Sequence, residues 1–246
     1  MLNVENWTLK NPKKVKDLLE AQAKLEELVH APAPSSQGFL SAETLEVALN
    51  EHTKHTLYSG QERQRAINLA RNTIERQLKA EVNNNLDSYL EQVEAIFNPA
   101  AEAYAEAVEK LPAGKFTADA VLGFSKEQRE AYHTAREAAG TISWASNWLY
   151  DLLDLPGQSL CGFSRWFLVA EPGNVGGLVC LQLEEDYAGE PAYGALLPPL
   201  LRALREGAQL RVAIPSQARE DAQEQENARQ GMDDQAWLTL RRDLKL

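Results

Sequence analysis

The fold of this chain is decided by residues 61–111, which read QERQRAINLARNTIERQLKAEVNNNLDSYLEQVEAIFNPAAEAYAEAVEKL. The stretch contains one proline and no glycine, and apolar residues recur at intervals of eleven, as at Ile67, Leu78 and Tyr89. Eleven residues in three turns give about 3.67 residues per turn, which favours a nearly straight seam over a left-handed heptad coiled coil. The pattern predicts a long helix whose apolar stripe is covered by another helix.

Two features qualify the prediction of one continuous helix. The pair Asn98-Pro99 predicts either a kink or the start of a second collinear helix, because proline lacks a backbone donor and suits a first helical position. The run Asn83-Asn84-Asn85 is a second weak point, since asparagine has poor helix propensity.

A partner for this helix is predicted within the chain. Ser125 and Gln128 form the pattern of a capping box, and a seam of mostly small residues follows from Ala131 to Leu152. The short connection before it favours an antiparallel helical hairpin, which leaves roughly Ile67 to Leu86 for another subunit or for the N-terminal helices. Trp144 and Trp148 lie beside this seam, and we expect them to be either part of the core or an anchor pair for a protein partner. The candidate interaction residues are Ile67, Ile74, Leu78, Val82, Trp144 and Trp148.

The rest of the chain is divided by composition. Residues 1–30 predict an N-terminal docking helix that starts near Asn11-Pro12, and residues 31–40 form a linker rich in proline and serine. A helical bundle with the long hairpin is expected over residues 41–155, and its first helix runs from Ser41 to about Leu57.

Residues 156–246 predict a small α+β module of the order β-β-α-β-β. Its strands are expected at 163–170, 178–184, around Leu210–Ile214 and at 236–246, with a helix from Pro198 to Glu206. The charges around the last segment would equally suit a helix, so both readings stay open there. Residues 216–231 are polar throughout and predict an exposed helix or a disordered arm.

Composition and charge favour some classes of function over others. The chain has 25 Lys and Arg against 36 Asp and Glu, a net charge of −11, which argues against binding to nucleic acid or anionic membranes. A basic patch among residues 10–16, with Arg63, Arg65, Arg71 and Arg76, keeps a nucleic-acid role as a third hypothesis. Two cysteines and no apolar run at the start predict a cytoplasmic protein, or one assembled in a virion, without a signal peptide.

One short motif resembles that of a known family. Cys161-Gly162-Phe163-Ser164 is similar to the motif of monothiol glutaredoxins, in which the cysteine follows a strand and opens a helix. Here the cysteine follows a Pro-Gly turn and precedes an apolar run read as a strand, so no redox site is predicted. His52 and His55 stand one turn apart without a third ligand at a fixed spacing, and we predict no metal, cofactor or catalytic residue.

These observations predict a mostly α-helical, non-enzymatic structural or assembly protein. It would self-associate or dock protein partners through long helices, and its layout resembles small structural proteins of tailed phages and accessory subunits of bacterial complexes. The alternative is a small-ligand or enzyme domain in residues 156–246, carried on a helical dimerisation arm.

Overall fold

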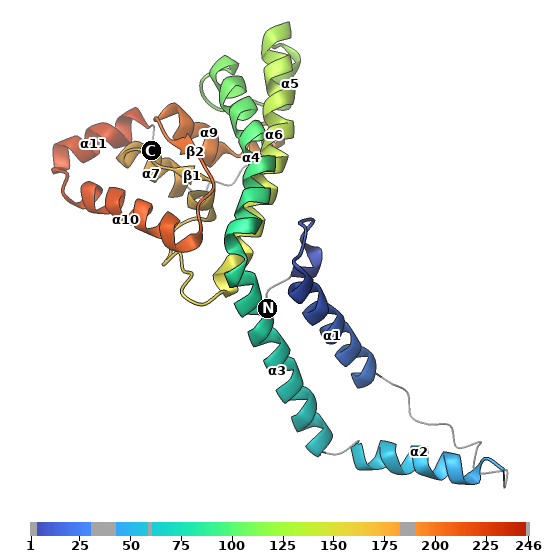
Figure 1. The fold of residues 1–246 in the computed structure, drawn as a ribbon. Helices are drawn as coiled ribbons and strands as arrows, with labels where there is room; N and C mark the ends of the chain where they lie inside the picture. The colour runs from blue at the N-terminus through green and yellow to red at the C-terminus, as the bar shows by residue number, and fades with distance from the viewer. Residues whose placement is uncertain (1–3, 31–42, 59–60, 183–189, 245–246) are drawn as a thin grey trace. The chain divides into compact units, whose positions relative to one another are not determined.

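The computed structural model describes residues 4–30, 43–58, 61–182 and 190–244 (Figure 1). It is mostly helical, which confirms the predicted class. The chain divides into two compact units. The first, which we call the α1–α3 unit, holds Lys10–Leu86, and the second, the α4–α11 unit, combines Leu2–Leu9 with Asp87–Leu246. The sequence-based boundaries at residues 30, 40 and 155 stay predictions.

The α1–α3 unit consists of α1 (Lys13–Val29), α2 (Leu45–Tyr58) and α3 (Gln61–Asn84). Helices α1 and α3 pack side by side (Figure 1). They run antiparallel, because Lys14 at the start of α1 contacts Glu81 near the end of α3, whereas Glu26 near the end of α1 contacts Arg71. The predicted linker and Ser41 lie outside the described residues.

The predicted long helix is divided at Asn85, between α3 and α4 (Leu86–Lys110). The Asn85 side-chain amide donates to the carbonyl of Glu81 at 2.7 Å, and such local bonds compete with regular helix. Pro99, the other predicted interruption, lies inside α4 without ending it. Pro99 is exposed, so water can bond the carbonyl that loses its usual donor.

The other long helix of the α4–α11 unit is α6 (Lys126–Asp151), which follows the short helix α5 (Ala118–Leu122). Its predicted capping box is confirmed: Gln128 N–H donates to Ser125 Oγ at 3.2 Å, and Ser125 N–H donates to Gln128 Oε1 at 3.1 Å. The seam residues of α6 are buried, namely Ala131, Ala135, Ala138, Ile142, Ala145, Leu149 and, just after the helix, Leu152.

Trp7 joins the N-terminal segment to both long helices. Its ring lies 5.4 Å from that of Tyr89 on α4 and 5.3 Å from that of Trp148 on α6, between centroids, and both pairs meet edge to face. Its indole N–H donates to Asp151 Oδ2 at 3.3 Å. Burial raises the pKa of Tyr89 to about 12. The N-terminal segment contains the short 3-10 helix Val4–Asn6. Val4, Trp7 and Leu9 of this segment are buried and therefore belong to the core of the unit.

Two tyrosines connect the long helices to the C-terminal part of the chain. The Tyr104 hydroxyl on α4 donates to the carbonyl of Leu196, and the Tyr132 hydroxyl on α6 donates to the carbonyl of Ala192 at 3.1 Å. Both acceptors lie in or just after helix α8 (Pro191–Gly194). Burial raises the pKa of the Tyr104 hydroxyl.

The predicted β-β-α-β-β order is corrected by the structure. Within the described part of the chain, the only sheet pairs β1 (Ala170–Glu171) with β2 (Gln209–Leu210), antiparallel, with Ala170 opposite Leu210. Of the first predicted strand, Arg165–Leu168 form a 3-10 helix and only Ala170 lies in a strand, β1. The second predicted strand falls in helix α7 (Val175–Gln182), with residues 183 and 184 outside the described range. The predicted central helix is confirmed as α9 (Pro198–Arg205).

Local capping explains why α7 is a helix. The Asn174 side-chain oxygen accepts from Gly177 N–H at 2.9 Å, as an N-cap residue does. Gly177 permits this turn, because a Cβ there would lie 2.0 Å from the carbonyl oxygen of Pro172. Leu178, Cys180 and Leu181 are all buried, and an apolar run buried on every side has no periodicity that separates helix from strand.

The C-terminal segments are also helical. The predicted polar arm is α10 (Pro215–Gln230), whose Ala218 and Ala222 are buried. The last predicted strand is wrong: the segment forms α11 (Asp234–Asp243), where the Asp233 side chain caps the first turn by accepting from Ala236 N–H at 2.7 Å. Among the helices described, none is long and apolar enough to cross a membrane.

The contacts of Trp7 predict how its replacement changes the stability of the fold. Replacing Trp7 with Ala should lower the free energy of unfolding by about 3–5 kcal/mol, because a buried ring between Tyr89 and Trp148 is lost. Urea unfolding followed by far-UV circular dichroism measures this change. Leu122→Ala, at a side chain that is 78% exposed, should change it by less than about 0.5 kcal/mol. Equal effects of the two substitutions would contradict the place of Trp7 in the core.

Candidate interaction surface

The α1–α3 unit exposes more large apolar side chains than it buries. Among its described residues, the buried apolar ones are Val15, Ala48, Leu78 and Val82. Five large apolar side chains remain 44–69% exposed, and these define the candidate surface: Leu28, Leu45, Val47, Leu49 and Leu69. Exposed apolar residues are common singly, but a concentration of them on a unit with so small a core is typical of an interaction surface.

Helix α2 carries three of these five side chains. Leu45 and Leu49 stand one turn apart and so share one side of the helix, whereas Val47 points elsewhere. The neighbouring Glu46 and Glu51 are also exposed. The arrangement gives α2 an apolar ridge that a second helix could cover.

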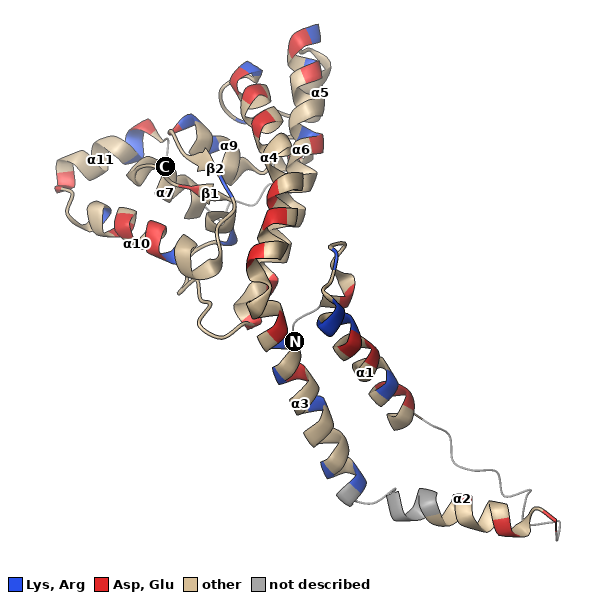
Figure 2. Ribbon diagram, in the orientation of Figure 1, with Lys and Arg blue, Asp and Glu red and all other residues tan. Residues whose placement is uncertain are grey.

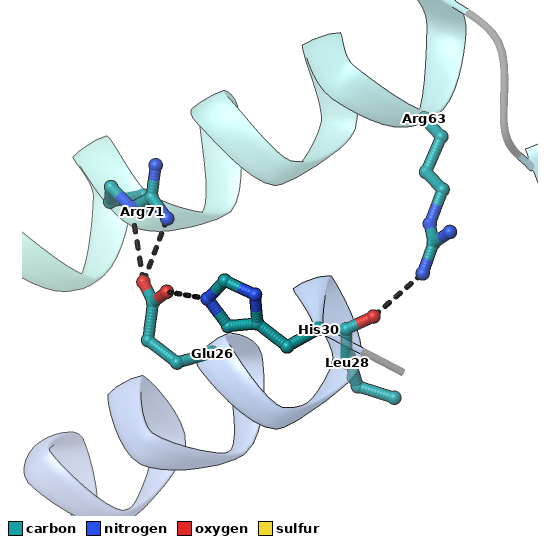
Figure 3. A network of polar contacts seen from close by, with 5 residues as sticks. All are labelled: Glu26, Leu28, His30, Arg63 and Arg71. Atoms are coloured by element: carbon teal, nitrogen blue, oxygen red, sulfur yellow. Dashed lines mark hydrogen bonds and ion pairs between the residues drawn. The ribbon is translucent and has the colours of Figure 1, made fainter. Parts of the chain in front are cut away.

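A polar network fixes the end of α1 to the first half of α3 (Figure 3). Arg71 donates through Nη2 and Nε to Glu26 Oε1, at 2.7 and 3.3 Å, and His30 Nε2 lies 3.9 Å from Glu26 Oε2. Arg63 Nη2 donates to the carbonyl oxygen of Leu28 at 2.6 Å. That carbonyl is among the last of α1, where a helix leaves its acceptors unpaired and favours a cation.

Helix α1 begins with lysines and carries charges of both signs after them (Figure 2). Lys13, Lys14 and Lys16 lie at its start, and Asp17, Glu20, Lys24, Glu26 and Glu27 follow along the helix. Lys14 Nζ is 3.4 Å from Glu81 Oε1, so ionic contacts with α3 occur near both ends of α1. Lys14 is 77% exposed, so its pair with Glu81 contributes little to stability.

The sequence-predicted interaction residues have different degrees of burial. Leu78, Val82 and Trp148 are buried, whereas Ile67, Ile74 and Trp144 are half-buried. Their contact with a partner stays a prediction. Val47 and Leu69 were not predicted from the sequence, because neither is one of the apolar positions that recur every eleven residues between 61 and 111. Leu45 and Leu49 were predicted only as one side of a short helix.

Cys161 is exposed and lies in a left-handed turn, with φ of 46°. Its sulfur is 3.3 Å from Ser159 Oγ, and Arg219 Nη1 donates to it at 3.7 Å. The hydrogen bond with Ser159, and then that with Arg219, lower the pKa of the thiol. The next helical element is the four-residue 3-10 helix, so the strand–cysteine–helix order of the glutaredoxins is absent at this site.

Comparisons with known proteins find no matching family model, no matching curated protein and no matching solved structure. Across the part of the chain that is described, no group of three or more His, Cys, Asp or Glu side chains is placed to hold a metal ion. The function is therefore inferred from the helices and their surfaces.

The surroundings of Cys161 predict the pH dependence of its alkylation. Arg219→Gln removes a hydrogen bond and a positive charge beside the sulfur, so the pKa of the thiol should rise and the midpoint of its reaction with iodoacetamide should move to higher pH. Mass spectrometry of the Cys161 peptide against time measures the rate, and buried Cys180 should react only after unfolding. An unchanged midpoint would mean that Arg219 does not act on the thiol.

Proposed function

We propose that this chain is a non-enzymatic structural or assembly protein that self-associates through its α1–α3 unit. The proposal rests on one observation. Helices α1, α2 and α3 expose five large apolar side chains, whereas the described part of the unit buries only four apolar residues. Full burial of such a side chain contributes about 1.5–3 kcal/mol, so a contact that covers Leu45 and Leu49 of each copy is a substantial driving force.

A second copy of this chain is the partner that fits best. Two helices such as α1 and α3 bury little between them, and two such pairs could enclose a common core as a four-helix arrangement. A symmetrical contact of this kind uses the same surface on both copies.

We also propose that α4 and α6 form the antiparallel hairpin predicted from the sequence. Supporting contacts lie at two places: Tyr89 of α4 is 6.4 Å from Trp148 of α6 between ring centroids, and Tyr104 and Tyr132 donate to neighbouring carbonyls around α8. The first pair joins the start of α4 to the end of α6. A helical hairpin in the same chain as an associating unit suits a component of a phage virion or an accessory subunit of a bacterial complex.

The self-association of the wild-type chain should depend on α2. We expect oligomers in light scattering coupled to size-exclusion chromatography over about 1 µM to 1 mM, which covers association free energies of about 8 to 4 kcal/mol. The double variant Leu45→Glu, Leu49→Glu should shift the population to monomer, because each carboxylate would lose its water in the contact. Leu and Glu have similar helix propensities, so α2 itself should remain.

A matched control places the same charges on exposed leucines of the other unit. Leu122→Glu with Leu238→Glu, at side chains that are 78% and 64% exposed, should leave the oligomer unchanged. A wild-type chain that is monomeric over the whole range would overturn the proposal. So would an oligomer that both double variants weaken equally.

A further inference from the structure

The pair of helices α1 and α3 is incompletely covered where the end of α1 meets the start of α3. Near the start of α1, the apolar residues Val15, Leu78 and Val82 are buried. Towards its end, five apolar residues of the two helices are only half-buried, and we call them the open stripe: Leu25, Val29, Ile67, Ala70 and Ile74. A third helix is the usual cover for apolar side chains that two packed helices leave partly in water.

Polar contacts hold the open stripe in place (Figure 3). Arg71 donates to Glu26 Oε1 at 2.7 Å. Arg63 donates to the carbonyl oxygen of Leu28 at 2.6 Å. These contacts keep the end of α1 beside the first half of α3, so the stripe is already assembled in one copy. A helix that covers it binds a preorganised surface.

The apolar ridge of α2 has a spacing that matches the open stripe. Ile67, Ala70 and Ile74 stand at steps of three and four residues and so share one side of α3. Leu45 and Leu49 of α2 are also four residues apart. In an antiparallel contact that places Leu45 beside Ile74, the second leucine therefore lies beside Ala70, whose small side chain leaves room for it.

Helix α2 does not cover the open stripe of its own copy in this structure. Leu45 and Leu49 are 44% and 57% exposed. One chain thus carries both an uncovered ridge and an uncovered stripe. Two copies can satisfy both at once, because a reciprocal exchange of the same element uses the same surface on each copy.

We propose that α2 of one copy covers the open stripe of a second copy, and that α2 of the second copy covers the first. The inference rests on the self-association proposed above and identifies the segment that makes the contact. Leu45 of each copy lies against Ile74 of the other, and Leu49 lies against Ala70. The exchange buries both leucines of each copy and leaves the contacts between α1 and α3 unchanged.

Disulfide trapping between two variants of the full chain tests the exchange. Both variants carry Cys161→Ser, which removes the exposed thiol, whereas Cys180 is buried. Leu45→Cys, with an affinity tag that changes its mass, is mixed with Ile74→Cys at a concentration where the wild type is oligomeric. Oxidation with copper phenanthroline in air should give a mixed dimer on a non-reducing gel, because a disulfide forms where two Cβ atoms come within about 4 Å.

Leu69→Cys is the matched control for Ile74→Cys. Leu69 is on the same helix and is 69% exposed, but it lies five residues from Ile74 and so on another side of α3. With Leu45→Cys it should give about tenfold less mixed dimer, since chance encounters seldom meet the geometry of a disulfide. Circular dichroism and light scattering check each reduced variant. If Ile74→Cys fails to fold or associate, Leu49→Cys with Ala70→Cys is the second pair.

The outcomes separate this contact from the proposed function. A wild-type oligomer that gives no mixed dimer from either pair would overturn the exchange and leave self-association standing. Trapping by Leu69→Cys that equals trapping by Ile74→Cys would also overturn it. So would a chain carrying both Leu45→Cys and Ile74→Cys whose disulfide closes only within the chain. A wild type that is monomeric at every concentration would overturn the proposed function together with the exchange.

Discussion

The packing of Trp7 between Tyr89 and Trp148 is the constraint on which the α4–α11 unit depends. Its indole N–H bonds Asp151, 144 positions along the chain, so the N-terminal segment, the start of α4 and the end of α6 meet at one point. At the far ends of the same helices, Tyr104 and Tyr132 bond the backbone around α8. Polar groups on these aromatic rings thus add direction to a core that is otherwise packed mainly by apolar side chains.

The helical class followed from the sequence because long periodic stripes and capping residues act locally. The stripe of residues 61–111 repeats every three turns and the capping box at Ser125 spans one turn, so both depend only on residues that are near in the sequence. The region after residue 155 did not follow, because its apolar runs are short and buried on several sides, where a period of two cannot be separated from 3.6. Single side chains decided the outcome there, as Asn174 and Asp233 capped helices where strands were expected.

The candidate interaction surface was predicted only in part. Periodicity selected Leu78 and Val82, which are buried, because a stripe marks the side of a helix that is covered. It did not select Val47 or Leu69, whose exposure becomes visible only when the neighbouring helices are in place. The hydrogen bonds from Arg205 to the carbonyls of Leu111 and Pro112 could not be predicted at all, since the two segments are far apart in the sequence and backbone acceptors leave no sequence pattern.

The place of Trp7 in the core also has a consequence for the connectivity of the chain. Residues 2–9 belong to the same unit as residues 87–246, so the α1–α3 unit is an insertion within a discontinuous domain. Closing a loop costs free energy that grows only with the logarithm of its length, so the insertion could lengthen or shorten with little effect on its host. The inserted unit is joined to the host domain by two peptide connections rather than one, so a partner bound to it is tethered to the host at two points of the chain.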